Sequence, residues 1–153
     1  ALDGDGPFSP ERTGSLPVNE LVNICFSGKY TEQEVRKMLV GAGGFVAYLG
    51  TNDAYQVECK AKEGDKKCEF IQEAMAYQVS KEIGAMATVL KGNIDGIFLT
   101  GGIAYSKPFV ESIKEKVSFI APVHVYPGED EMGALAQNAM MLINGEVECK
   151  EYV

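Results

Sequence analysis

Three glycine-containing loops of this 153-residue chain carry side chains or bare backbone that suit ligand chemistry. The first holds Arg12, whose planar and permanently charged guanidinium suits a phosphoryl group or a carboxylate. The second is Gly101-Gly102, taken together with Asn52-Asp53. The third is Glu129-Asp130-Glu131, which directly follows Pro127-Gly128. All three are loop positions at which α/β proteins build their binding sites.

The glycine pair at 101–102 is predicted to connect a strand to a helix. The apolar run at 95–100 is typical of a short strand buried on both faces. Ser106 has the position of a helix N-cap, with Pro108 in the first turn. Because glycine lacks a β-carbon, such a turn lets a flat base or a sugar lie against the backbone. These residues alone favour the simpler interpretation, a tight turn between strand and helix.

The other two polar segments also have simple structural explanations. Asp53 is predicted to cap a helix that runs through Ala61, and capping is the favoured interpretation of Thr51-Asn52-Asp53. The carboxylates at 129–131 stand where a final helix begins. They either complement its dipole, at about 0.3–1 kcal/mol each, or hold a magnesium ion directly or through its water. Spacing does not separate these two interpretations, and the first is slightly favoured.

Charge and cysteine content argue against several classes of protein. The net charge is −8 without a basic run, which argues against a nucleic-acid partner. No apolar stretch has membrane-spanning length, and there is no signal peptide. The scattered cysteines argue against structural zinc and a disulfide scaffold, and reduced thiols fit a cytoplasmic protein. They are Cys25, Cys59, Cys68 and Cys149.

Motifs of several common catalytic sites are missing from the sequence. It contains no G-x-x-x-x-G-K-[ST], no G-x-G-x-x-G and no G-x-S-x-G, which argues against P-loop, Rossmann and serine hydrolase sites. His124, the only histidine, falls within a predicted strand and is expected to be structural. Arg36, the only arginine besides Arg12, falls in a helical stretch and is expected on a solvated face.

Hydrophobic periodicity predicts one helix-rich α/β domain. The loop at 2–15 has no period, and its composition favours a disordered end over the wall of a site. Residues 45–49 suit a short strand or an apolar loop, and Gly84 inside the longest helix suggests close approach by a neighbouring element. Helices are predicted at 17–27, 32–40, 53–61, 65–91, 106–116 and 130–143, and strands at 95–100 and 123–126. Because helices and strands alternate in the second half, the strands are expected to pair in parallel.

Five stretches together resemble the butyrate kinase branch of the acetokinase family. They are ALDGDGPFSPER at 1–12, LGTND at 49–53, AMAYQ at 74–78, LTGGIAYS at 99–106 and YPGEDEM at 126–132. The match is specific, because acetate kinases have a different loop where this chain has Gly-Pro-Phe-Ser-Pro-Glu-Arg. The resemblance implies an α/β fold of the ribonuclease H-like type, that of sugar kinases, actin and heat shock proteins, with a short, mostly parallel sheet.

The resemblance also implies a reaction, in which ATP and a short-chain fatty acid such as butyrate give ADP and an acyl phosphate, with magnesium. Arg12 then resembles the family's active-site arginine, which stabilises the phosphoryl group in flight. Thr51-Asn52-Asp53 and Gly101-Gly102-Ile103 resemble the adenosine-binding segments. Glu131, together with Asp130, resembles the carboxylate that places the metal-bound nucleotide.

The same resemblance indicates that residues 1–153 are the C-terminal, nucleotide-side portion of an acyl kinase. The family's two glycine-rich phosphate hairpins and its N-terminal domain precede the point where this sequence starts. We therefore expect this piece alone to be inactive and to self-associate, and the parent to be a homo-oligomer. The alternatives are a kinase for acetate, propionate or a branched-chain acid, and a non-catalytic nucleotide-binding module.

Overall fold

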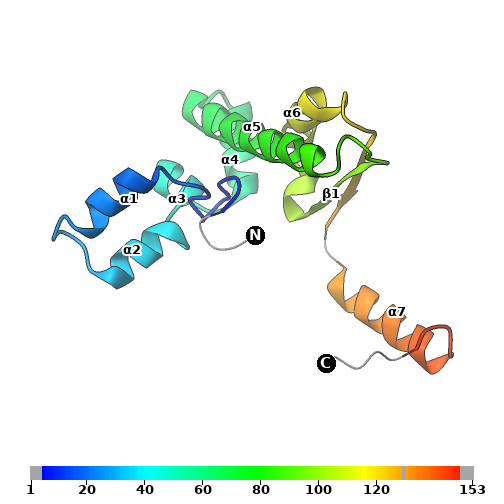
Figure 1. Cartoon of the computed structure of the whole chain (residues 1–153). Coiled ribbons are helices and arrows are strands. Elements are labelled where there is room, and N and C mark those ends of the chain that lie inside the picture. The colour runs from blue at the N-terminus through cyan, green and yellow to red at the C-terminus, as the bar shows by residue number, and fades with distance from the viewer. Residues whose placement is uncertain (1–4, 129, 149–153) are drawn as a thin grey trace.

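The computed structural model describes residues 5–128 and 130–148, and Figure 1 shows the arrangement of the elements. In chain order they are α1 (Val18–Cys25), α2 (Glu32–Leu39), α3 (Gly44–Leu49), α4 (Ala54–Lys62), α5 (Lys66–Val89), β1 (Ile97–Gly101), the 3-10 helix η1 (Gly102–Tyr105), α6 (Lys107–Val117), β2 (Val123–Pro127) and α7 (Glu131–Ile143). No helix in these described ranges is long and apolar enough to cross a membrane.

The long helix α5 organises the domain, with α4 and α6 packed against it. Strands β1 and β2 pair in parallel, in a register that runs from Ile97 opposite Val123 to Gly101 opposite Pro127. This confirms the parallel pair predicted from the alternation of helices and strands. The hydrophobic core collects buried side chains from the N-terminal loop and from α3, α4, α5 and α6, and its largest fully buried members are Phe45, Val57, Ile113 and Val117.

Side-chain caps fix the starts of three helices where the sequence predicted them. Thr31 and Glu34 form a capping box at α2, with the Glu34 N–H donating to Thr31 Oγ1 over 3.3 Å. Asp53 Oδ1 accepts from the Gln56 N–H at 3.0 Å, and Asp65 caps α5. The expected close approach at Gly84 is wrong, because a β-carbon placed there would meet no described atom within 4 Å.

The segment 45–49 is a helix, and the prediction of a strand or an apolar loop is wrong. At the start of α3 the Phe45 and Val46 N–H groups donate to the carbonyls of Ser9 and Pro10, over 3.3 and 3.1 Å. Helix N-termini leave such N–H groups without partners inside the helix. The acceptors lie more than thirty positions away in the chain, so the local apolar pattern contains no sign of them.

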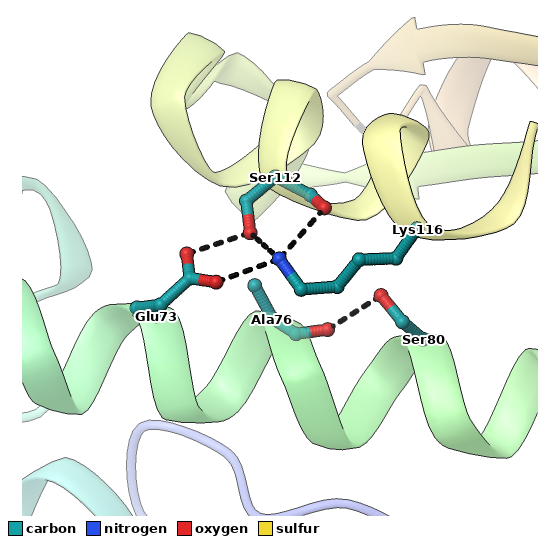
Figure 2. Close-up of polar contacts among 5 residues, drawn as sticks. All are labelled: Glu73, Ala76, Ser80, Ser112 and Lys116. Carbon is teal, nitrogen blue, oxygen red and sulfur yellow. Dashed lines mark hydrogen bonds and ion pairs between the residues drawn. The ribbon is translucent and has the colours of Figure 1, made fainter.

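A polar cluster joins α5 to α6 on the side of the helix pair that Figure 2 shows. Lys116 Nζ donates to Glu73 Oε1 at 2.6 Å, and the Ser112 hydroxyl donates to Glu73 Oε2 at 2.6 Å. Burial raises the pKa of Glu73, but the hydrogen bonds from Lys116 and Ser112 outweigh it, so the pKa lies below its ordinary value of 4.5.

Because the pKa of Glu73 is lowered by folding, this carboxylate stabilises the fold above pH 4.5, and the contribution is lost as the pH falls further. We expect Glu73→Gln to lower the free energy of unfolding at pH 7 by less than about 1 kcal/mol, since the Glu73 side chain is 52% exposed. Urea unfolding at pH 7 and pH 3 measures this, with Glu111→Gln as control. If the difference in unfolding free energy between wild type and Glu73→Gln is as large at pH 3 as at pH 7, the lowered pKa of Glu73 is contradicted.

Helix α7 extends away from the rest of the domain (Figure 1), and none of its residues is buried. Its bounds, with Asp130 as the N-cap and Asn144 as the C-cap, agree with the predicted helix at 130–143. Large apolar side chains are exposed along it, namely Met132, Leu135, Met140 and Ile143. The domain therefore leaves an apolar helix face in solvent.

Candidate functional site

The part of the glycine- and proline-rich N-terminal loop that the structure describes is held in one ordered conformation. The Glu11 carbonyl accepts from the N–H groups of Gly41 and Gly43, at 2.8 and 3.1 Å. The Thr13 N–H donates to the Leu39 carbonyl at 3.0 Å. Composition favoured a disordered end, and that preference is wrong because these long-range backbone bonds hold the loop against the α2–α3 connection.

Arg12 lies on this ordered loop, where its backbone forms a bridge with Val40. Its side chain is exposed, and within residues 5–128 and 130–148 its guanidinium forms no ion pair. Arg36 instead pairs with Glu32 at 2.7 Å on an exposed face of α2, as the sequence predicted. The backbone at Arg12 is thus fixed while its charged fork remains available to a ligand.

A side-chain hydrogen bond joins the Arg12 loop to the segment 51–53. Asn52 Nδ2 donates to Glu11 Oε2 at 3.3 Å. The other two residues of the segment serve the local backbone, since Asp53 caps α4 and Thr51 Oγ1 accepts from the Asp53 N–H at 3.1 Å. The capping interpretation of Asp53 is confirmed, and the segment nonetheless lies beside the loop that carries Arg12.

The glycine pair ends the strand and begins η1, which fills the stretch before Ser106. Gly101 is the last residue of β1, and its φ of 81° belongs to the left-handed region that favours glycine. Gly102 has no positive φ, and a β-carbon placed on it would meet no atom of the described chain within 4 Å. The backbone of Gly102 therefore borders open space. Helix α6 then starts after Ser106, as predicted.

That open space is a small cavity between α4 and η1, which we call the α4–η1 cavity. Its volume is about 150 Å³. It is lined by Ala54, Tyr55, Glu58, Gly102, Ile103, Tyr105 and Ser106. Of the predicted residues, Gly102 and Ile103 line this cavity, and residues 51–53 lie next to it in the chain, because Asp53 directly precedes Ala54.

A second, larger and mostly apolar cavity of about 430 Å³ lies next to it. Ala54 and Ile103 line both cavities, and Ser9 and Pro10 from the N-terminal loop line only the larger one. The N-terminal loop, the start of α4 and the turn after β1 thus surround one continuous region of the surface. Arg12 lies two residues beyond Pro10 on that loop.

Glu58, which no sequence pattern singled out, also lines the α4–η1 cavity. It is only 8% exposed, and Lys62 binds its Oε1. Burial raises the pKa of Glu58, but hydrogen bonds from Lys62 and Ser106 outweigh it, so the pKa lies below 4.5 and the group is ionised at neutral pH. A Glu and a Lys four residues apart on a helix usually form a solvated pair, so the spacing gave no sign of burial.

Asp130 and Glu131 lie at the start of α7, and the chain shortly before them contacts the glycine turn. The Gly128 N–H donates to the Gly101 carbonyl at 3.0 Å, and Asp130 follows two residues later. Asp130 Oδ1 accepts from the Gly133 N–H at 2.9 Å, so Asp130 caps the start of α7. Glu131 is exposed, and Glu129 lies outside the described residues. Among the described residues, no three His, Cys, Asp or Glu side chains are grouped as metal ligands.

Solved structures of acyl kinases share this fold. An acetate kinase from Porphyromonas gingivalis superimposes with a TM-score of 0.77 at 16% identity, over 90% of this chain and 41% of that one. A propionate kinase from Francisella tularensis gives 0.73 at 19% identity, over 84% of this chain and 39% of that one. This confirms the fold class expected from the sequence.

The family model described as the acetokinase family matches residues 9–128, and this chain belongs to that family. A probable butyrate kinase from Clostridium botulinum strain Alaska E43 is 57% identical over 152 residues. Butyrate kinase 2 from Clostridium acetobutylicum is 56% identical over 152 residues. Both alignments cover 99% of this chain, which spans 43% of the length of each relative.

Proposed function

We propose that this chain is the nucleotide-binding part of a butyrate kinase, which transfers a phosphoryl group between ATP and the carboxylate of a short-chain fatty acid. The observation that carries the proposal is the α4–η1 cavity, at which the start of α4 and the glycine turn converge. The identity to butyrate kinases supports the choice of acyl substrate. In this proposal, Thr51, Asn52, Asp53, Gly101, Gly102 and Ile103 surround the adenosine of ATP or ADP.

Arg12 is proposed as the catalytic residue that neutralises the phosphoryl group during transfer. Phosphoryl transfer depends on positioning and charge neutralisation more than on covalent chemistry from the protein. The exposed guanidinium on a loop held by backbone hydrogen bonds meets both needs. The Asn52–Glu11 hydrogen bond supports a shared site, because it joins this loop to the segment proposed for the nucleotide.

Asp130 and Glu131 are proposed to place magnesium with the nucleotide. Glu131 is proposed as a catalytic residue because it would position this ion. Exposed carboxylates suit this ion, which keeps several waters and takes oxygen ligands. One oxygen of Asp130 is used by the cap of α7, and the carboxylate retains acceptor sites for a bound water. Magnesium bound there would neutralise phosphate charge during transfer.

The remaining parts of the active site are proposed to come from sequence that this chain does not contain. The chain spans 43% of the length of its relatives, so we expect it alone to lack kinase activity. The exposed apolar face of α7 supports a homo-oligomeric parent protein. Cys25, Cys59 and Cys68 are free thiols, which supports a cytoplasmic location.

A hybrid protein tests the proposed reaction. In it, this chain replaces the matching segment of the Clostridium botulinum relative, and acyl phosphate formation from ATP and butyrate is measured. Turnover by the hybrid and none by the 153-residue chain is the expected result. A hybrid that binds MgADP in calorimetry without turnover would support a non-catalytic nucleotide-binding module instead, and a folded hybrid that binds no nucleotide would contradict the proposal.

Gly102→Val is expected to reduce MgADP affinity by at least about tenfold without lowering the melting temperature. An added β-carbon would meet no described atom within 4 Å, and the valine side chain would occupy part of the α4–η1 cavity. Calorimetry on the hybrid measures affinity, and thermal unfolding measures stability. Gly101 is a poorer test position, because its positive φ would strain any replacement. Unchanged affinity in Gly102→Val would place the nucleotide elsewhere.

A further inference from the structure

We propose that Glu58 recognises the 6-amino group of the nucleotide base and so selects adenine nucleotides over 6-oxo purines. This inference rests on the proposed nucleotide function and adds to it a residue that determines base specificity. It is carried by the composition of the α4–η1 cavity, which combines a backbone floor, two aromatic rings and one buried carboxylate.

The walls of the cavity suit a flat heterocycle. Tyr55 on α4 and Tyr105 at the end of η1 both line it, and they are 75% and 69% exposed. Stacking of a base on an aromatic side chain is favourable for any base, because every base has a π-face. Gly102, which also lines the cavity, adds no side chain, and this lets such a ring approach the backbone. These features favour a base without selecting among bases.

Glu58 supplies the selective group. Its carboxylate is nearly buried, and its lowered pKa keeps it ionised at neutral pH, so it accepts hydrogen bonds and donates none. Lys62 binds Oε1, while Ser106 accepts from Gln72 Nε2 at 3.2 Å and keeps its own hydroxyl proton to donate. Each carboxylate oxygen has two acceptor sites, so these partners leave capacity for a ligand donor.

An ionised acceptor that lines the cavity distinguishes the two purines at position 6. The 6-amino group of adenine donates to it, whereas the 6-oxo group of hypoxanthine is a second acceptor that loses its hydration without gaining a partner. A hydrogen bond to a charged group in a buried site is worth at least about a tenfold ratio of affinities. The same carboxylate remains bound to Lys62 when no ligand is present.

Calorimetric titration of the hybrid protein with MgATP and MgITP tests this assignment. The wild-type hybrid is expected to bind MgATP at least about tenfold more tightly than MgITP. In Glu58→Gln the ratio is expected to fall to about threefold or less, since the amide can donate to the 6-oxo group. Glu63→Gln, which removes an exposed carboxylate one residue beyond α4, is the matched control and should keep the wild-type ratio.

The ratio separates recognition from a purely structural role. If Glu58 only paired with Lys62 within α4 and joined this helix to Ser106, Glu58→Gln would lower stability and weaken the binding of both nucleotides equally. An unchanged ratio in Glu58→Gln, or a wild-type hybrid that prefers MgITP, would therefore overturn the inference while leaving the proposed function intact. A folded hybrid that binds neither nucleotide would contradict the proposed function itself.

Discussion

Replacing Arg12 by alanine is expected to lower kcat for phosphoryl transfer to butyrate by about a thousandfold in the hybrid protein. The affinity for MgADP is expected to change by less than about threefold, because no part of the α4–η1 cavity is formed by Arg12. We expect kcat to fall because the guanidinium stabilises charge that develops during transfer. Its removal therefore destabilises the transition state. Steady-state kinetics and calorimetry measure the two quantities.

Two further variants make the Arg12 prediction specific. Arg12→Lys keeps the charge but loses the planar fork, so we expect an intermediate loss of kcat. Arg36→Ala removes the other arginine, which pairs with Glu32 on a solvated face, and should leave kcat unchanged. An Arg12→Ala variant with near wild-type kcat, or with a lowered melting temperature that explains its loss, would refute a catalytic role.

Gly44→Ala is expected to destabilise the domain by roughly 2–5 kcal/mol, the combined effect of backbone strain and steric overlap. Gly44 has a φ of 54°, and an added β-carbon would overlap the Ser9 carbonyl oxygen. The same replacement would displace the loop that accepts the first N–H groups of α3 and carries Arg12. Urea unfolding of the 153-residue chain measures the loss of stability.

Gly28→Ala is the matched control for the steric part of this prediction. Gly28 also has a positive φ, of 69°, but nothing lies within 4 Å of an added β-carbon. We expect it to cost about 1 kcal/mol, from the backbone conformation alone. Equal losses of unfolding free energy in the two variants would show that the Ser9 carbonyl does not lie against Gly44. The N-terminal loop would then not be ordered as described.

The sequence predicted those features of the fold that depend on neighbours along the chain. Capping by Thr31, Asp53 and Asp65 needs only a polar side chain and a helix that starts within three residues. The parallel strand pair follows from the order of elements, since a helix between two strands returns the chain in the same direction. These are local or topological consequences, and the structure confirms them.

Features that depend on partners far apart in the chain could not be predicted from the sequence pattern. The order of the N-terminal loop and the helical state of 44–49 have one cause, the hydrogen bonds between residues 9–13 and 39–46. The burial of Glu58 depends on the approach of η1 to α4, and no local pattern reports that approach. At the level of sequence, Asn52-Asp53 and the glycine turn are grouped as one candidate site, and the family resemblance gives the reason, since both segments resemble parts of an adenosine site.

A crystal structure of the hybrid protein with MgADP would show whether the α4–η1 cavity is the nucleotide site. We expect electron density for the base in this cavity, between Tyr55 and Tyr105 and over Gly102. We also expect the 6-amino nitrogen to lie within hydrogen-bond distance of Glu58, at about 3 Å. A base bound in the larger apolar cavity beside Ser9 and Pro10, or at any other place on the domain, would show that the α4–η1 cavity is not the nucleotide site.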